Sequence, residues 1–353
     1  MKVTVTKNLN IRSGKPYITD TNNVSYYAPG QQVEVDRFIS GQAINGNDKW
    51  FAISNTNNYA WTGGTDQSQN FNLNANPYIN LVDYSKLMSN IPQEWIKTKG
   101  AGINVAVFDS GINTTHIDFN NIFSSGNNGI DYTNSPSGLR DVANHGTHVS
   151  SLIGARTPNT HGIIGLAPQC NLFVIKVGDD SGSFFSDSIL KGLTWASQNN
   201  IDIINMSFSI NYQNYKNILP ALGAIKNCVI VASAGEDDVL TNDNEGFFYP
   251  AMDPNIISIG AIKQATQGDF YPTLNYLLPL IPVQGCSGIG ENSYIQELGS
   301  SMSAAHLTGL IALYLSFINK SNINKGSIIN ALDKIAIPFN ASIPLTSLTI
   351  IKP

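Results

Sequence analysis

The chain has 353 residues, of which 42% are hydrophobic and 13% charged, so it is long and apolar enough for one large domain and one small one. Its net charge of −5 offers no basic surface to nucleic acid or an anionic membrane, and we expect neither as a partner. The cysteines are widely spaced, without the pattern of a disulfide framework or a zinc site, and are expected to be buried free thiols: Cys170, Cys228 and Cys286.

The N-terminal residues contain no apolar run of signal-peptide length. The longest apolar stretch, residues 307–318, is interrupted by Thr308, Gly309 and Ser316 and is too short to span a bilayer. As written, the sequence predicts a soluble protein that stays in the cytoplasm. If a leader has been removed from the start of this sequence, the protein would instead be exported.

Residues 1–68 are predicted to form a small all-β domain. Alternating runs such as VTVTKNLNIR and QQVEVDRFI are separated by turn-rich segments such as RSGKP and NGND. Residues 69–90 are polar and rich in asparagine, as expected of a linker.

From residue 91 to residue 353 the pattern changes to that of an α/β domain. Apolar runs, including INVAVFDS, IDIINMSFS and CVIVASAG, alternate with helical stretches such as MSAAHLTGLIALYL. Strands that are apolar on both faces and separated by helices are typical of a parallel sheet covered on both sides. In such sheets we expect the reactive groups beyond the carboxyl ends of the strands.

Three segments at such positions carry reactive residue types. In VAVFDSGI, Asp109 leaves a strand and enters a turn, where Asp-Ser-Gly is also common without a catalytic role. In NHGTHVSSLIG, His145 and His148 are three residues apart, which also suits a metal pair, although no acidic ligand or third histidine follows. In LGSSMSAAH, Ser300 and Ser301 precede an apolar helix, where serine often caps the N-terminus.

Taken in the order Asp, His, Ser, these segments suit nucleophilic catalysis, in which an aspartate orients a histidine that deprotonates a serine. FDSGINTTHIDF, NHGTHVSSLIG and GSSMSAAH resemble the three catalytic motifs of the subtilisin-like serine proteases (subtilases, peptidase family S8). The segments IIGLAPQCNLFVIKV, IDIINMSFS and FYPAMDPNIISIGAI resemble the family's intervening strands. The resemblance covers about residue 91 to the C-terminus. It implies the subtilisin-like fold, a parallel sheet sandwiched by helices.

The resemblance implies a serine endopeptidase that cleaves a peptide or protein through an acyl-enzyme and needs no cofactor for the chemistry. Asp109 would orient the base, His145 would be the general base and acid, and Ser301 would be the nucleophile, because Ser301 directly precedes Met302. The substrate-binding positions implied by the resemblance are Ser207, Phe208, Ser209, Ser233, Ala234 and Gly235.

The sequence departs from the subtilase pattern at the oxyanion hole. VASAGEDD puts Glu236 where the family has an asparagine that donates to the developing negative charge. An ionised carboxylate about 4 Å from that charge would repel it by roughly 4 kcal/mol. A protonated Glu236 could instead donate, and activity would then favour mildly acidic pH. Asn242 and Asn244 lie a few residues further on as substitute donors.

Two further departures bear on specificity. Ser209 and Ile210 stand where the family has two glycines, so we expect a restricted pocket. Ala305 replaces the proline of the serine motif, which raises the alternative of a peptide ligase or cyclase using the same acyl-enzyme. Another alternative is a pseudoprotease, an attenuated binding scaffold with an intact triad.

The N-terminal domain resembles a bacterial SH3-like (SH3b) barrel over about residues 3–66. Such modules often recruit a protein or a cell-wall partner, so the resemblance favours targeting of the protease, with masking of its cleft as the alternative. The aromatic residues that either line a binding groove or fill the barrel core are Tyr26, Tyr27, Trp50, Phe51, Tyr59 and Trp61.

A structural calcium ion is also implied by the resemblance. Asp118 matches a family ligand position, and the loop of residues 159–163 occupies the corresponding region. Backbone carbonyls supply most calcium ligands in such loops, so the residue types alone leave occupancy open.

Overall fold

The computed structural model describes residues 2–13, 23–44, 47–53, 56, 58–61, 82–88, 90–119, 122–123, 129–156, 162–236, 249–262, 273–321, 323–339 and 348–352. The chain divides into two compact units. The first is Met1–Asn80 with Ser293–Ile295, and the second is Leu81–Asn292 with Gln296–Pro353.

The N-terminal unit contains a six-stranded antiparallel sheet in the order β1-β4-β5-β6-β2-β3. Its strands are β1 (Lys2–Thr4), β2 (Leu9–Ser13), β3 (Asn23–Tyr27), β4 (Gln32–Ile44), β5 (Asn47–Ile53) and β6 (Asn58–Trp61). Along β4, Val33 and Val35 are buried while Gln32 and Glu34 are exposed, the alternation expected when one face of a strand packs inward. Every regular element among the described residues of 1–68 is a strand, as predicted.

The second unit is built on a nine-stranded sheet in the order β18-β19-β15-β14-β13-β12-β8-β11-β9. Between β15 and β9 in this order, every pair of adjacent strands is parallel, whereas β19 is antiparallel to β15. This confirms the predicted, mostly parallel sheet. The bounds are β8 (Asn104–Asp109), β9 (Gly129–Asp131), β11 (Asn171–Lys176), β12 (Ile203–Met206), β13 (Val229–Glu236), β14 (Ile257–Ile262), β15 (Leu274–Pro279), β18 (Ile337–Pro338) and β19 (Ile351–Lys352).

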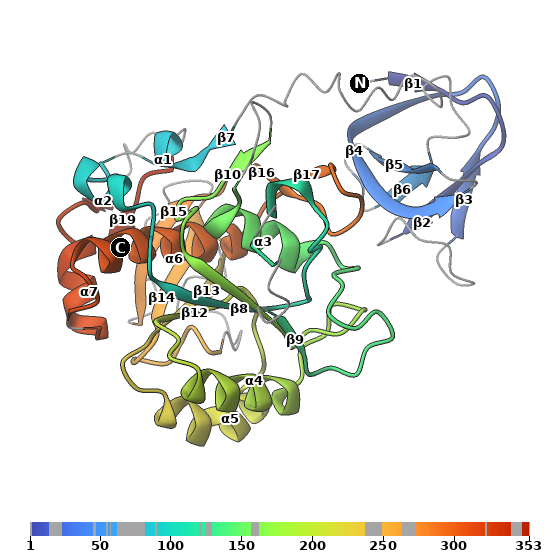
Figure 1. The fold of residues 1–353 in the computed structure, drawn as a ribbon. Coiled ribbons are helices and arrows are strands. Elements are labelled where there is room, and N and C mark those ends of the chain that lie inside the picture. The colour runs from blue at the N-terminus through green and yellow to red at the C-terminus, as the bar shows by residue number, and fades with distance from the viewer. Residues whose placement is uncertain are drawn as a thin grey trace. The chain divides into compact units, whose positions relative to one another are not determined.

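Helices cover both faces of this sheet: α4 and α5 lie on one face, and α3 and α6 lie on the other (Figure 1). The helices are α1 (Tyr84–Leu87), α2 (Gln93–Thr98), α3 (His145–Gly154), α4 (Ser186–Gln198), α5 (Tyr212–Ala224), α6 (Ser300–Phe317) and α7 (Lys325–Leu332), with a 3₁₀ turn η3 (Ile117–Phe119). Two small sheets pair β7 (Val82–Asp83) with β10 (Ile163–Ile164) and β16 (Val283–Cys286) with β17 (Tyr294–Glu297). None of the described helices is long and apolar enough to cross a membrane.

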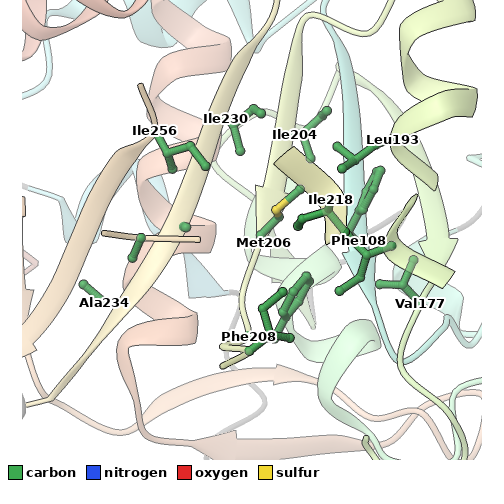
Figure 2. Packing of buried hydrophobic residues seen from close by; sticks show 14 of the residues in the cluster. Phe108, Val177, Leu193, Ile204, Met206, Phe208, Ile218, Ile230, Ala234 and Ile256 are labelled. Atoms are coloured by element: carbon green, nitrogen blue, oxygen red, sulfur yellow. The ribbon is translucent and has the colours of Figure 1, made fainter. Parts of the chain in front are cut away.

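The core between the sheet and helices α4 and α5 holds the strand ends in place. Phe108 of β8, Met206 of β12 and Leu193 of α4 belong to one buried cluster (Figure 2). Burying each such side chain contributes about 1.5–3 kcal/mol. Gly192 lets α4 approach β8, because a Cβ there would lie 2.8 Å from the Phe108 ring. Asp109 directly follows Phe108, and Ser207 directly follows Met206, so the same packing fixes where these two residues leave their strands.

The cysteines are free thiols, as predicted. Cys170 and Cys286 are buried, whereas Cys228 is half-buried.

Candidate active site

Asp109 and His145 are joined at the start of helix α3. Asp109 is the last residue of β8 and is fully buried, and His145 is the first residue of α3. The Asp109 Oδ1 and the His145 Nδ1 are 2.8 Å apart. The imidazole of His145 is 30% exposed, so it is tied to a buried carboxylate yet open to solvent. This arrangement orients the ring and stabilises its cationic form.

Burial alone would lower the pKa of His145, because it disfavours the charged imidazolium. The neighbouring Asp109 carboxylate outweighs burial, both through its charge and through its hydrogen bond, with smaller contributions from Glu297 and Asp141. The net result raises the pKa of His145 to about 9. His145 is therefore a strong base, and it is neutral only at alkaline pH.

Asp141 is a second buried carboxyl group on this side of the site, and the sequence reasoning missed it. Its Oδ1 accepts the Ser110 hydroxyl at 2.9 Å, and its Oδ2 accepts the Thr147 backbone N–H at 2.8 Å. The Ser110 Oγ in turn accepts the Gly146 N–H at 2.9 Å. Burial raises the pKa of Asp141, and these donors offset only part of that effect. The network ties the residue after Asp109 to the first turn of α3. The available signal was an acidic residue four positions before His145.

Ser301 is the second residue of α6 and faces the end of β12. Its Oγ donates to the Ser207 carbonyl at 3.1 Å, and the Ser207 Oγ donates to the Ser301 carbonyl at 2.9 Å. The side chain of Asn205 supports this pair. Its Nδ2 donates to the Ser207 Oγ at 2.9 Å, and its Oδ1 accepts the Thr308 hydroxyl at 2.9 Å. These bonds fix the N-terminal turn of α6 against β12, and with it the position of Ser301.

Glu236 contacts the N-terminus of α6. It is the last residue of β13, and its Oε1 accepts the Ser300 backbone N–H at 2.5 Å. The Ser300 Oγ accepts the Gly235 N–H at 3.1 Å instead of capping α6. The N-cap residue is Gly299, which has no side chain to cap with, so the interpretation of Ser300 or Ser301 as the cap is wrong. A Cβ on Gly299, whose φ is +150°, would lie 3.2 Å from the Glu236 Oε1.

The predicted substrate-binding positions lie at the ends of β12 and β13. Ser207 and Phe208 are buried, and the Phe208 ring stacks on Phe184 with centroids 4.3 Å apart. Ser209 is exposed, but Ile210 belongs to the hydrophobic core. Of the two replaced glycine positions, therefore, only Ser209 presents a side chain at the surface. The β13 positions are buried: Ser233, Ala234 and Gly235.

The remaining histidines are packed into the interior or lie outside the described residues. The His148 Nε2 bonds the Val283 carbonyl at 3.0 Å, which places this ring in the core and removes the support for a His145–His148 metal pair. The His306 Nδ1 bonds the Met302 carbonyl at 2.7 Å, and burial lowers the pKa of His306 to about 4, so it stays neutral. His116 is buried. His161 lies outside the described residues, as do the substitute donors proposed at positions 242 and 244.

Asp118, the predicted calcium ligand, is buried in η3. Its Oδ2 accepts the Ile163 N–H at 2.8 Å, and its carbonyl accepts the Arg156 N–H at 2.6 Å. Of the loop proposed to complete the calcium site, only residues 162–163 are described. The described side-chain donors beside Asp118 are His116 and Cys286, an imidazole and a thiol. These two side chains are not oxygen ligands, and calcium binds six to eight oxygens. The backbone carbonyls expected to supply most of them belong to a loop of which only residues 162–163 are described, so the calcium site stays a prediction.

A mostly parallel sheet with an Asp–His pair at one strand end, a serine in the first turn of a helix and the chain order Asp, His, Ser matches the subtilisin type of protease. Comparison with known proteins agrees. Residues 100–332 match the model of the subtilase family (Peptidase_S8), and the chain belongs to this family.

The curated relatives are bacterial subtilisins and intracellular proteases. Subtilisin E of Bacillus subtilis (strain 168) is 31% identical over 223 residues, which are 62% of this chain and 56% of subtilisin E. The major intracellular serine protease of the same organism is 31% identical over 263 residues, 69% of this chain and 81% of that protein. The match thus spans little more than half the length of subtilisin E.

Solved structures of the same fold cover between 67% and 74% of this chain. Sphericase has a TM-score of 0.54 at 26% identity and covers 67% of this chain and 84% of its own. The prenylagaramide maturation protease PagA has a TM-score of 0.57 at 22% identity and covers 74% of this chain and 96% of its own.

Proposed function

We propose that the protein is a serine endopeptidase of restricted specificity that acts through Asp109, His145 and Ser301. The observation that carries this proposal is the 2.8 Å bond between buried Asp109 and partly exposed His145, in a chain whose Ser301 lies in the first turn of helix α6. Membership in the subtilase family supports the same chemistry.

In the proposed reaction, neutral His145 takes the proton of the Ser301 hydroxyl as its oxygen attacks the scissile carbonyl. Asp109 stabilises the resulting imidazolium, which then protonates the leaving amine. Water then hydrolyses the acyl-enzyme. His145 takes a proton from the attacking water and returns it to the Ser301 oxygen as that oxygen leaves. Ser301 donates to the Ser207 carbonyl in the structure, so this bond must be exchanged for one to His145 when substrate binds. The raised pKa of His145 favours alkaline pH over the mildly acidic range, because only the neutral ring accepts the proton.

Glu236 is proposed to occupy the position of the oxyanion-hole asparagine and to attenuate the enzyme. Its Oε1 accepts an N–H at the start of α6, next to the nucleophile. A carboxylate in this contact is an acceptor stabilised by the helix N-terminus. The tetrahedral intermediate needs donors at that place, so an ionised Glu236 both uses one donor and repels the oxyanion.

Substrate specificity is proposed to depend on the edge at the end of β12 and the pocket at the end of β13. The backbone of residues 207–209 would pair with an extended peptide, as in other strand-addition modes of recognition. The buried Phe208 takes part through its backbone only. Ser209, exposed where the family has glycine, is the position that narrows the binding site.

The N-terminal sheet is proposed to be an SH3-like module that recruits a protein or cell-wall partner. Trp50 and Phe51 are buried and serve the core. Tyr26 is 62% exposed, and three half-buried rings complete the surface-accessible aromatic set: Tyr27, Tyr59 and Trp61.

Labelling with a fluorophosphonate probe, followed by intact mass measurement, tests the proposed nucleophile. We expect one adduct on the wild type and on Ser300→Ala, and none on Ser301→Ala. Labelling should accelerate as the pH rises through about 9, the pKa of His145. Absence of an adduct on the wild type between about pH 6 and pH 10 would contradict the proposal, because that range brackets the His145 titration.

The second candidate is a binding scaffold with a silent active site, and the Glu236–Ser300 contact is the observation that favours it. A scaffold would give no turnover of a peptide library by the wild type or by Glu236→Gln. An endopeptidase would give cleavage products in at least the variant. Adding an amine to the same assay detects transfer to amines by product mass, which is the ligase or cyclase outcome.

A further inference from the structure

A polar side chain is buried in the middle of the sheet, behind the proposed nucleophile. Asn205 is fully buried in β12 between Ile204 and Met206, whose side chains belong to the apolar cluster under α4 and α5 (Figure 2). Because side chains alternate across a strand, Asn205 points to the opposite face of the sheet, which α6 covers (Figure 1). An amide in such a place is stable only when its polar atoms are hydrogen-bonded.

Asn205 is the middle of a chain of three hydrogen bonds that leads from Thr308 to Ser301. The Thr308 Oγ1 and the Asn205 Oδ1 are 2.9 Å apart, as are the Asn205 Nδ2 and the Ser207 Oγ. The Ser207 Oγ is 2.9 Å from the Ser301 carbonyl oxygen. Thr308 is fully buried and lies about two turns after Ser301 in α6. The chain of bonds therefore starts on α6, passes through the end of β12 and returns to the first turn of α6.

The acceptor at the end of this chain fixes the direction of every bond in it. A carbonyl oxygen can only accept, so the Ser207 hydroxyl must donate its single hydrogen to Ser301. The Ser207 Oγ then accepts from Asn205, which turns the Asn205 Nδ2 toward Ser207 and the Oδ1 toward Thr308. An amide oxygen also only accepts, so the Thr308 hydroxyl is the donor that begins the chain.

We propose that Thr308 is a positioning residue for the nucleophile and that it acts through Asn205 and Ser207. Its hydroxyl orients the Asn205 amide so that the Ser207 hydrogen goes to the Ser301 carbonyl. That bond holds the first turn of α6, and with it the Ser301 hydroxyl, which donates back to the Ser207 carbonyl at 3.1 Å. This inference rests on the proposed role of Ser301 as the nucleophile.

Loss of the Thr308 hydroxyl should disturb the reaction more than substrate binding. Thr308→Val replaces the hydroxyl by a methyl group of similar size. The Asn205 oxygen then regains a donor when the amide turns round and accepts the Ser207 hydrogen, which is thereby lost to Ser301. A misplaced reacting group lowers the rate by up to about 10²-fold. The backbone edge at residues 207–209, proposed to bind the peptide, does not use this hydroxyl, so KM should change little.

Steady-state hydrolysis of one peptide by the full chain tests the proposal. We expect kcat of Thr308→Val to fall by about 10–10²-fold at a nearly unchanged KM. Thr308→Ser keeps the hydroxyl and should retain the kcat of the wild type. Thr194→Val is the matched control, because the Thr194 hydroxyl donates to the Leu190 carbonyl within α4 at 2.8 Å. It should also behave as the wild type does.

A double variant distinguishes action through Ser207 from a general loss of packing. Ser207→Ala removes the last link of the chain, so adding Thr308→Val to it should lower kcat no further. Two results would overturn the proposal: equal kcat in Thr308→Val and Thr308→Ser, or losses that add in the double variant.

Hydrogen exchange followed by mass spectrometry provides a readout that needs no activity. The start of α6 should exchange faster in Thr308→Val than in Thr308→Ser, while α4 should exchange equally in both. If the wild type cleaves no peptide, the proposed function fails, and the exchange comparison then decides on Thr308 by itself. Faster exchange confined to the start of α6 would support its positioning role, and equal exchange there would overturn it.

Discussion

Helices α3 and α6 each carry a residue of the candidate site in the first turn, and each has a carboxylate bound to a backbone N–H in that turn. At α3, Asp141 accepts the Thr147 N–H in the same turn as His145, whose ring bonds Asp109. At α6, Glu236 accepts the Ser300 N–H next to Ser301. The same interaction has opposite consequences, because cationic charge develops at α3 during the proposed reaction and anionic charge develops at α6. A carboxylate supports the first and opposes the second.

The largest expected effect comes from removing the negative charge beside His145. Asp109→Asn keeps the shape of the side chain but changes the hydrogen bond that sets the imidazole tautomer. We expect kcat to fall about 10⁴-fold, as in other proteases with this triad. The pKa of His145 should also fall from about 9, because Asp109 is the group that raises it most.

Steady-state peptide hydrolysis measured across pH checks this prediction. Asp187→Asn, which neutralises an exposed carboxylate in the first turn of α4, is the matched control and should leave kcat unchanged. Full activity of Asp109→Asn would show that the Asp109–His145 bond is not part of the catalytic machinery.

A smaller loss is expected when the support behind that pair is weakened. Asp141→Ala leaves the Ser110 hydroxyl and the Thr147 N–H without their acceptor, at a cost to stability of about 1–3 kcal/mol for each buried group. Misplacement of the catalytic groups should lower kcat by up to about 10²-fold.

The pH profile separates positioning from folding in this experiment. Asp141 helps to raise the pKa of His145, so Asp141→Asn should move the rising limb of kcat/KM to lower pH. A purely structural role would lower the folded fraction without moving that limb.

The smallest effect concerns the pH dependence of stability. The folded-state pKa of His145 is about 9, above the ordinary value of about 6.5. A raised pKa means that the folded state binds the proton more tightly, so this contribution is complete below about pH 6.5 and is lost as the pH rises through about 9. Denaturant unfolding of the wild type should show this decline, and His145→Ala should show less of it. An equal decline in stability in the wild type and in His145→Ala would show that another group causes it.

The local parts of this site were predictable from the sequence, and the long-range parts were not. Asp109, His145 and Ser301 lie in short segments whose strand-end or helix-start patterns are local, and the structure places them at the end of β8 and the starts of α3 and α6. The parallel sheet was predictable for the same reason, because the apolar runs that mark its strands are also local patterns. Confirmation of the family rests on the match over residues 100–332.

Contacts between distant segments explain what the sequence did not reveal. The bond from Ser300 to Glu236 joins residues 64 positions apart, and the approach of Cys286 to Asp118 joins residues 168 apart. Ile210 was expected beside the substrate pocket, yet it packs into the core with Phe208 because the chain turns inward after the exposed Ser209. No spacing rule within a segment encodes such pairings.

The central proposal is that Glu236 attenuates a serine protease that acts through Asp109, His145 and Ser301. The most direct measurement is kcat/KM for one peptide substrate with the wild type and with Glu236→Gln, which replaces a charged acceptor by a neutral donor of the same shape. The account predicts an increase of about 10²-fold at neutral to alkaline pH, the usual contribution of one oxyanion donor. A decrease in kcat/KM would contradict it and would identify Glu236 as the working donor.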